Sequence, residues 1–338
     1  MSRILTDDGI CYNFNLLDFK ELFRKEQLSD AYRFMEWNNP KSEWNREEGY
    51  DSDRLESYPR RISGSGTKFN LYLLLQRNRT DEAAMCQGTR NGFKVAFHLA
   101  DELPVVHEQF NRVSLNQIVS LAITPQLSHS TPKLKEFSSR QRRCFYNSER
   151  YLRFFRVYNL NNCLIECLVN ATFKRCGCSP FFLPHGPEMP ACNFSQQGCY
   201  KRVAEGAYTS QESTRSCRCV PACAGVDYKV EQNQVPTSHR FNAFAKKWHF
   251  QNQSSFSYDT TILSISLKAR NVVVNIQRER LSKEDIVGKF GGLFALFLGA
   301  SLMTGVEIFY YCLIRPLRIF FGTNPTGVPI RMVQPISN

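Results

Sequence analysis

A single long apolar stretch interrupts an otherwise mixed pattern of apolar and polar positions. It occupies residues 290–314 and contains one charged side chain, Glu307. A helix that crosses a bilayer needs about 20 apolar residues, so this stretch is long enough to span a membrane. All of the cysteines except Cys312 lie before it. The pattern predicts one C-terminal transmembrane helix behind a large cysteine-containing region.

The region before this stretch carries short apolar runs that are typical of β-strands. The runs lie at residues 71–75, 93–97, 261–267 and 272–274. Within the polar segment between residues 14 and 70, a helical part is predicted from residue 16 to residue 34, followed by a loop. The glycine turn at residues 64–68 is interpreted as a linker, because it lacks the spacing of a phosphate-binding loop. Together these runs predict an α+β fold that is rich in strands.

The net charge is positive but dispersed. The chain has 43 Lys and Arg against 31 Asp and Glu, a formal net charge of +12, and a mean hydropathy of −0.37. The basic residues are scattered among acids, and no basic helix or aromatic-interleaved basic stretch stands out. We therefore assign the excess positive charge to a basic, solvent-exposed surface and predict no nucleic-acid partner.

The cysteines are concentrated in one region. Most of the 13 lie between Cys144 and Cys223, a density that favours disulfides in an oxidising compartment. Zinc sites usually present Cys-x2-Cys pairs, whereas the close pairs in this chain have one or three intervening residues. These pairs are Cys163-x3-Cys167, Cys176-x-Cys178 and Cys217-x-Cys219-x3-Cys223. We therefore predict an extracellular disulfide-bonded region with no metal or other cofactor.

Asn-x-Ser/Thr sequons agree with an extracellular location. They lie at Asn78, Asn170, Asn193 and Asn252, all before the apolar stretch. Residues 1–15 lack the apolar core of a signal peptide, and the Lys and Arg residues on both sides of the stretch do not fix its orientation. We therefore expect an upstream translocating segment outside these residues, which makes the chain a fragment or an N-terminally truncated isoform.

Two pairs of cysteines are spaced to form nested bridges. Asn161, or the asparagine that follows it, can cap a helix on which Cys163 and Cys167 share one face. Cys217 and Cys219 share one face of an extended strand. A helix face and a strand face with two thiols each suit a ladder of antiparallel bridges. Spacing alone leaves the pairing open, because so many cysteines allow a large number of connectivities.

The sequence GICYNFN at residues 9–15 resembles the Gly-x-Cys-Tyr-x-Phe-Asn signature of degenerin and epithelial sodium channel subunits. Further blocks resemble that family in the same order along the chain. They lie at residues 92–98, 102–104, 149–167, 291–292, 299–301 and 306–307. The block that begins at Glu149 is similar to the insect pickpocket branch. The resemblance covers residues 9–318 and is specific because the blocks occur together.

The resemblance implies a sensory subunit of a trimeric, sodium-selective, amiloride-sensitive cation channel in the plasma membrane. The implied partners are sodium ions, other subunits of the family in a homo- or heterotrimer, and the lipid bilayer. The extracellular part would contain a β-rich palm and β-ball, a helical finger and a disulfide-stapled thumb. The implied parts are palm, β-ball and finger at 1–143, thumb at 144–223, lower palm at 224–289, pore helix at 290–314 and cytosolic tail at 315–338.

The resemblance also implies the disulfide pairing of the thumb. The implied pairs are Cys144–Cys223, Cys163–Cys219, Cys167–Cys217, Cys176–Cys199 and Cys178–Cys192. In the family, the cysteine at the position of Cys11 pairs with a cysteine that lies beyond a first membrane helix. No segment of these residues matches that helix. Cys86 is the available substitute partner. Acid-sensing relatives carry a tryptophan just before the first thumb cysteine. This chain has Gln141-Arg142-Arg143 there, so we do not expect proton gating.

The pore helix would carry the selective chemistry. Gly299, Ala300 and Ser301 let helices approach closely and expose carbonyls that can replace part of the hydration shell of sodium. Ordinary packing of small residues is the alternative. Glu307 would attract cations in an inner vestibule, or would extend to the membrane interface instead. Gly288 matches a position where bulky residues hold family channels open. The alternative is a hinge or loop glycine, which is compatible with that gating role.

The sequence offers no catalytic motif. It contains no Gly-x-Ser-x-Gly, and His107-Glu108 lacks the second histidine of a zinc-protease helix. We therefore predict that the protein is not an enzyme. The alternative to a conducting subunit is a non-conducting, membrane-tethered regulatory or ligand-binding subunit, which would alter currents only when a full-length partner is present.

Overall fold

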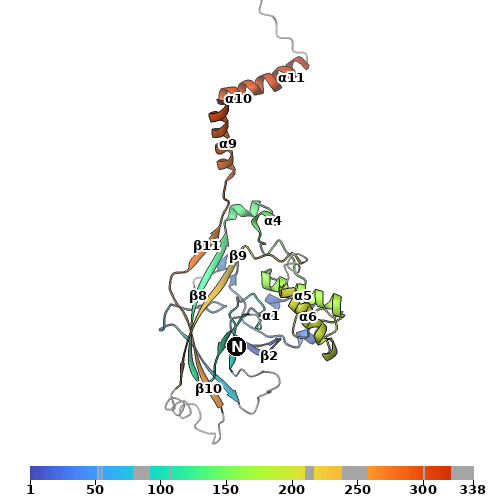
Figure 1. The fold of residues 1–338 in the computed structure, drawn as a ribbon, viewed down its shortest axis with the longest axis vertical. Helices are drawn as coiled ribbons and strands as arrows, with labels where there is room; N and C mark the ends of the chain where they lie inside the picture. The colour runs from blue at the N-terminus through green and yellow to red at the C-terminus, as the bar shows by residue number, and fades with distance from the viewer. Residues whose placement is uncertain are drawn as a thin grey trace, which may run out of the picture. The chain divides into compact units, whose positions relative to one another are not determined.

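The computed structural model divides the chain into two units, Met1–Arg278 and Glu279–Asn338. We describe each unit by itself. The structure describes residues 1–51, 54, 56–78, 92–106, 109–209, 217–237, 258–299 and 301–320. The first unit combines a sheet with a group of helices (Figure 1). The predicted α+β class is therefore confirmed for this unit.

The sheet of the first unit is organised around one long strand, β8 (Gln117–Ser130). β9 (Ala224–Pro236) runs antiparallel along nearly all of it. On the other side, β10 (Tyr258–Leu267) lies parallel to the first half of β8, and β11 (Val273–Gln277) lies parallel to the second half. β5 (Leu71–Asn78) pairs antiparallel with β10. β8 therefore sets the register of three other strands.

Alternation of side chains along these strands builds the core of the sheet. Val119 and Leu121 of β8 and Leu263 of β10 are buried, as expected when side chains alternate with a period of two. The short strands β6 (Phe93–Val95) and β7 (Asn111–Val113) contribute to the same core. The strand predictions are confirmed at residues 71–75, 93–95, 261–267 and 273–274.

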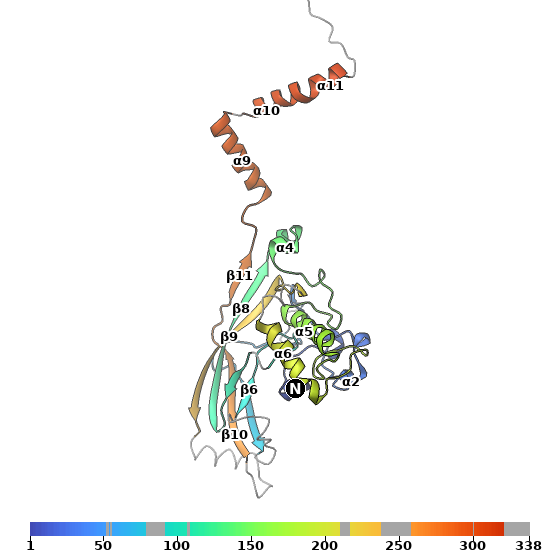
Figure 2. The same cartoon turned by 45° about the vertical axis from the view of Figure 1, so that its right-hand side comes forward.

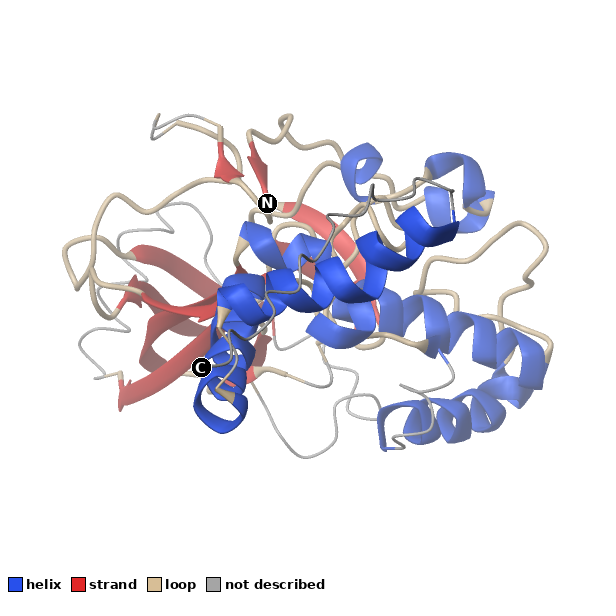
Figure 3. Ribbon diagram, turned by 90° about the horizontal axis from the view of Figure 1, so that it is seen from above, coloured by secondary structure: helices blue, strands red, loops and turns tan. Residues whose placement is uncertain are grey.

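A second core lies among the helices and the N-terminal hairpin (Figure 2). α5 (Leu160–Cys176) and α6 (Gln197–Thr209) lie side by side. The hairpin of β1 (Ser2–Thr6) and β2 (Gly9–Asn13) packs against this core through Ile4. The strands of the five-stranded sheet gather in one region of the first unit (Figure 3), and the two larger cores are one in this sheet and one among the helices and the hairpin.

Residues 16–34 form separate short helical pieces, so the prediction of a helix here is only partly right. The pieces are α1 (Phe19–Leu22), a 3-10 turn (Lys25–Gln27) and α2 (Asp30–Arg33). α1 ends at Phe23, whose backbone is extended, with φ −112° and ψ 153°. The ring of Phe23 lies 4.9 Å from that of Phe19 and 5.1 Å from that of Phe155. Burial of aromatic area therefore outweighs helix continuity.

The remaining elements in the described part of the first unit are short. They are β3 (Trp44–Asn45), β4 (Gly49–Tyr50), α4 (Ser139–Arg142) and 3-10 helices at Pro132–Glu136 and Phe194–Gln196. Arg46, in the turn between β3 and β4, donates to Asp101 and Glu102, each at 2.8 Å. Burial lowers the pKa of Arg46, but attraction to these two carboxylates outweighs burial and raises it. The buried charge is therefore paired.

α5 begins at an asparagine, but not at either asparagine predicted to cap it. The side chain of Asn159 accepts the N–H of Asn162 at 2.7 Å. Asn162 itself donates to the carbonyl oxygen of Asp101 at 2.9 Å and accepts the N–H of Leu103 at 3.2 Å. These bonds fasten residues 98–103, which we call the strap, to the start of α5.

The second unit is helical, but its apolar stretch is not the continuous helix that was predicted. α9 (Lys283–Leu298) and α10 (Leu302–Phe309) are separate helices. A π-helical turn (Tyr310–Ile314) and α11 (Arg315–Phe320) follow. Among the described residues, no helix is both long and apolar enough to cross a membrane. Most of the predicted tail, residues 321–338, lies outside the described residues.

We predict that Asn162→Ala destabilises the first unit more than Asn161→Ala does. Asn162 is fully buried, so its removal leaves the N–H of Leu103 and the carbonyl oxygen of Val157 without this partner, at a cost of about 1–3 kcal/mol. Asn161 is half-buried and donates one bond, to the carbonyl oxygen of Leu103 at 2.6 Å. Thermal unfolding of the two purified variants measures the difference, and equal melting temperatures would contradict the role of Asn162.

Candidate functional site in the cysteine-rich region and the interrupted helix

Two disulfides join α5 to the segment that follows α6. Cys163 and Cys167 pair with Cys219 and Cys217, with Cα–Cα distances of 5.8 Å and 5.9 Å. The prediction that Cys217 and Cys219 lie on an extended strand is wrong. Arg218, between them, has a φ of 51°, so the chain turns at this point. The nested order of the two bridges is nevertheless the one expected of a ladder.

Three further disulfides complete the region. They are Cys144–Cys223, Cys176–Cys199 and Cys178–Cys192. All the pairs are those that the resemblance implies, and each typically contributes about 2–4 kcal/mol. Among the described residues, Cys11 and Cys312 are free cysteines. Cys86, the suggested partner of Cys11, lies outside the described residues.

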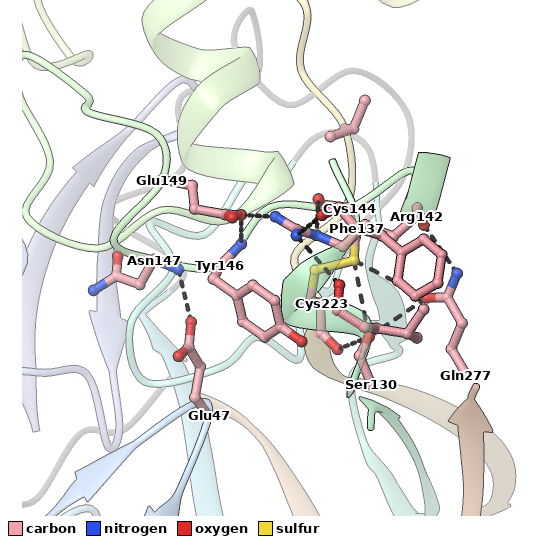
Figure 4. The surroundings of a disulfide bond; sticks show 12 residues. Glu47, Ser130, Phe137, Arg142, Cys144, Tyr146, Asn147, Glu149, Cys223 and Gln277 are labelled. Atoms are coloured by element: carbon pink, nitrogen blue, oxygen red, sulfur yellow. Dashed lines mark hydrogen bonds and ion pairs between the residues drawn. A yellow bond between two sulfur atoms is a disulfide. The ribbon is translucent and has the colours of Figure 1, made fainter. Parts of the chain in front are cut away.

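The Cys144–Cys223 disulfide lies where the cysteine-rich region meets the ends of β8 and β11 (Figure 4). Ser130, the last residue of β8, donates its hydroxyl to the carbonyl oxygen of Cys223 at 3.0 Å. Gln277, the last residue of β11, donates its amide to the carbonyl oxygen of Arg142 at 2.9 Å. The end of β11 is therefore bound to the cysteine-rich region next to this disulfide. We call Ser130, Arg142, Gln277 and the Cys144–Cys223 disulfide the junction.

Arg142 occupies the buried centre of the junction, with 3% of its surface exposed. Its guanidinium donates to the carbonyl oxygen of Phe137 at 2.6 Å and forms an ion pair with Glu149. The guanidinium carbon also lies 4.8 Å from the centre of the Tyr146 ring. A buried charge is tolerated when it is paired and its donors are satisfied. Arg142 therefore holds together α4, the disulfide and the loop that carries Glu149.

Glu166, on α5, anchors the loop that precedes the helix. Its carboxylate accepts the backbone N–H of Arg153 at 2.9 Å and that of Phe154 at 3.0 Å. Burial raises the pKa of Glu166, while these two bonds and the nearby arginines act in the opposite direction. Phe154 is fully buried, so Glu166 positions a residue of the helical core.

The described part of the chain holds no group of three or more His, Cys, Asp or Glu side chains that could bind a metal ion. At the junction, side chains of Ser130, Arg142 and Gln277 donate to backbone carbonyl oxygens. These bonds join Cys223 and α4 to the ends of β8 and β11.

The second unit is interrupted at residues predicted to form the selectivity region. Gly299 ends α9 with a φ of 63°, a conformation that favours glycine. Ser301 caps α10, because its Oγ accepts the N–H of Thr304 at 3.3 Å. Ala300 lies outside the described residues. The structure thus places a break at residues 299–301, where the sequence had predicted small residues inside a helix.

The other predicted pore residues lie on the helices that flank this break. Gly288 lies inside α9, so a loop glycine is the wrong description. Beyond the backbone of α9, a Cβ there would meet no atom of the described residues within 4 Å. Glu307 lies exposed on α10. α9 and α10 expose many large apolar side chains, which include Phe290, Leu293, Phe294, Leu296, Phe297, Met303, Val306, Ile308 and Phe309. So large an exposed apolar surface is typical of helices that contact lipid or another chain.

Two of the predicted glycosylation sites are exposed in the structure. Asn170 lies on the surface of α5, and Asn193 lies just before a 3-10 helix. Asn78 ends β5 and Asn252 lies outside the described residues. Glycosylation at these positions stays a prediction.

Comparison with known proteins identifies the family. A family model described as Amiloride-sensitive sodium channel matches residues 1–311. The chain therefore belongs to the amiloride-sensitive sodium channel family, which consists of ion channels and not of enzymes. The predicted resemblance is confirmed.

Several relatives match most of this chain. Pickpocket protein 28 of Drosophila melanogaster is 28% identical over 327 residues, which cover 93% of this chain and 53% of the relative. Sodium channel protein Nach of Drosophila ananassae is 26% identical, covering 73% of this chain and 46% of the relative. Acid-sensing ion channel 2 of Rattus norvegicus is 27% identical, covering 65% of this chain and 41% of the relative. The chain thus spans about half the length of the curated relatives it matches.

We predict that peptide mapping under non-reducing conditions links Cys163 to Cys219 and Cys167 to Cys217. The two cysteines of α5 lie one turn apart, so the crossed pairing would require the turn at Arg218 to reverse. Mass spectrometry of the digested protein, with free thiols blocked beforehand, identifies the linked peptides. Free thiols at these positions, or the crossed pairs, would contradict the structure of the region.

We predict that Arg142→Met lowers stability strongly, whereas Arg143→Met changes it little. Removing Arg142 leaves Glu149 without its ion pair and the carbonyl oxygen of Phe137 without a donor, at a cost of about 2–4 kcal/mol. This cost is below that of a fully buried pair because the Glu149 side chain is 33% exposed. Arg143 is the matched control, because it is adjacent and exposed. Melting temperatures of the two variants test this, and equal values would show that the junction does not depend on Arg142.

Proposed function

We propose that the protein is a subunit of an amiloride-sensitive, sodium-selective cation channel in which three related subunits surround one pore. The break at residues 299–301, within an exposed apolar pair of helices, is the observation that carries this proposal. Membership of the family supports it, as do relatives named as sodium channel and acid-sensing ion channel proteins.

A break in a helix releases backbone groups that a continuous helix would use. The last carbonyl groups of α9 lack the partners that further helical turns would supply. Such groups are costly in lipid, but they are tolerated where they line a hydrated space. Carbonyl oxygens in a narrow pore can replace part of the hydration shell of a cation. Three subunits would bring their breaks to one level, with Gly299, Ala300 and Ser301 forming the selective ring.

In this proposal, residues 290–314 cross the plasma membrane as helical pieces joined at the break, with the first unit outside the cell and the tail from residue 315 in the cytosol. The exposed apolar side chains of α9 and α10 support this placement, because lipid and neighbouring helices would cover them. Glu307 would attract cations in a hydrated inner vestibule, where its charge costs less than in lipid. The division of the first unit into finger, palm and thumb belongs to the same proposal.

Gly288 and the junction would control opening. Among the described residues, apart from the backbone of α9 itself, no atom lies within 4 Å of a Cβ placed at Gly288, so helices of neighbouring subunits could approach closely there. β11 ends at Gln277, and the chain enters the second unit at Glu279. A movement of the cysteine-rich region at Arg142 would therefore be passed along the chain to α9.

We predict that Ser301→Ala changes the sodium-to-potassium permeability ratio, whereas Ser282→Ala does not. Both serines cap a helix with the same reciprocal arrangement, so each variant loses a cap worth about 1 kcal/mol. Only Ser301 lies at the break. Oocytes express each form with and without a full-length pickpocket subunit. The measurements are amiloride-sensitive current, reversal potential and surface biotinylation.

The outcomes separate the candidate functions. A shifted reversal potential in Ser301→Ala alone, at normal surface levels, supports the selective role. An unchanged reversal potential at normal surface levels would leave helix packing as the role of residues 299–301. A change in the size of the partner's current, with its selectivity unaltered by any variant, would indicate a non-conducting regulatory subunit instead.

A further inference from the structure

His98, in the strap, is held by two hydrogen bonds that fix its protonation state. Its Nδ1 lies 2.7 Å from the carbonyl oxygen of Leu99, and its Nε2 lies 2.8 Å from the Nδ2 of Asn13. The Oδ1 of Asn13 accepts the N–H of Leu16 at 3.1 Å, so the amide faces His98 with its NH2 group. Nε2 is therefore the acceptor, and Nδ1 carries the single proton of a neutral ring.

A second proton on this ring would have no acceptor. It would bind to Nε2 and point at the NH2 group of Asn13 at hydrogen-bond distance, where two donors repel each other. Turning the amide around would offer its oxygen to His98 but would place the NH2 group against the N–H of Leu16. Asn13 is 4% exposed and Leu16 is fully buried, so water cannot readily replace the lost bond. Protonation of His98 therefore breaks at least one buried contact.

The charged groups that act on His98 are two carboxylates of the strap. Asp101 and Glu102 favour the charged ring, but both carboxylates are paired with Arg46. Burial is the larger effect and lowers the pKa of His98 below its ordinary 6.5, while the Leu99 carbonyl and the two carboxylates act in the opposite direction. The stabilisation is complete above the ordinary pKa. It is lost as the pH falls below that value toward the lower pKa of the folded state.

We propose that His98 is a proton-binding switch that releases the strap from the hairpin of β1 and β2 under mildly acidic conditions. The neighbouring bond along the strap joins the N–H of Leu17 to the carbonyl oxygen of Ala100 at 2.9 Å. The next carbonyl oxygen, that of Asp101, accepts from Asn162 at the start of α5. Loss of the His98 bond therefore weakens the series of hydrogen bonds that connects β2, through the strap, to α5. This inference does not rest on conduction by the chain.

His185 provides a matched comparison within the same unit. Its Nδ1 lies 2.8 Å from the carbonyl oxygen of Leu183, and its Nε2 lies 3.0 Å from the hydroxyl of Ser29. The arrangement is the same except that a hydroxyl replaces the amide. A hydroxyl can rotate to accept a proton from Nε2, whereas the amide of Asn13 is fixed by its second bond. Of these two histidines, His98 is the one that meets an opposing donor on protonation.

The test compares the purified full chain with its His98→Gln and His185→Gln variants at about pH 7.5 and about pH 5.5, on either side of the ordinary histidine pKa. Glutamine offers an oxygen near the position of Nε2 and does not titrate. Hydrogen exchange detected by mass spectrometry follows peptides that cover residues 13–17 and 98–103, corrected for the intrinsic effect of pH. Thermal unfolding reports the stability of the whole protein.

We expect the unmodified protein and His185→Gln to exchange several-fold faster in both peptides at the lower pH, with a lower melting temperature. His98→Gln should show no such increase. Asn13→Asp supplies acceptors to both Leu16 and a protonated His98, so it should reverse the response and slow exchange at the lower pH.

Two results would overturn the switch. One is a pH response in His98→Gln equal to that of the unmodified protein, and the other is a response that disappears in His185→Gln instead. If His98→Gln fails to fold, Asn13→Asp decides the question, because exchange that still accelerates at the lower pH in that variant contradicts the proposed conflict of donors.

Discussion

Backbone pairing along β8 is the constraint on which the rest of the first unit depends. This strand receives β9 on one side and β10 and β11 in succession on the other, so one set of backbone groups determines three registers. β9 begins directly after Cys223, and β11 ends at Gln277. Both points fall at the same end of β8, which places the Cys144–Cys223 disulfide and Arg142 there as well. The cysteine-rich region is thereby attached where the chain leaves the sheet.

The strands could be predicted because their signals are local, with apolar side chains recurring along short runs. The disulfide pairs came from the family resemblance, since spacing alone left them open. The helical character of residues 16–34 was predicted, but the break at Phe23 could not be, because it is favoured by a ring contact with Phe155, which is far away in the sequence. The cap of α5 was misplaced for a similar reason. Asn162 is occupied by Asp101 and Leu103, and Asn159 is left to cap the helix.

The candidate site was predictable only in part. Residues 299–301 and Gly288 were found through the resemblance, but the break was not, because small residues suit a closely packed continuous helix equally well. In the sequence, Arg142 stood out only because acid-sensing relatives have a tryptophan just before the first thumb cysteine and this chain does not. Its bond with Gln277 spans 135 positions, and that between Asn13 and His98 spans 85. No local pattern can reveal partners at such separations, so the polar contacts of the first unit were visible only in three dimensions.

β11 differs from the other strands of the sheet in one respect. All five of its residues are exposed, and its described pairing is with the second half of β8, which β10 does not use. β11 can therefore separate from the sheet without breaking a bond of β10 or uncovering Leu121. Segments with few buried contacts open at a much lower free energy than the whole domain. Once the bond between Gln277 and Arg142 is broken, this end of the sheet can open by itself and lengthen the chain before α9 while the rest of the first unit stays folded.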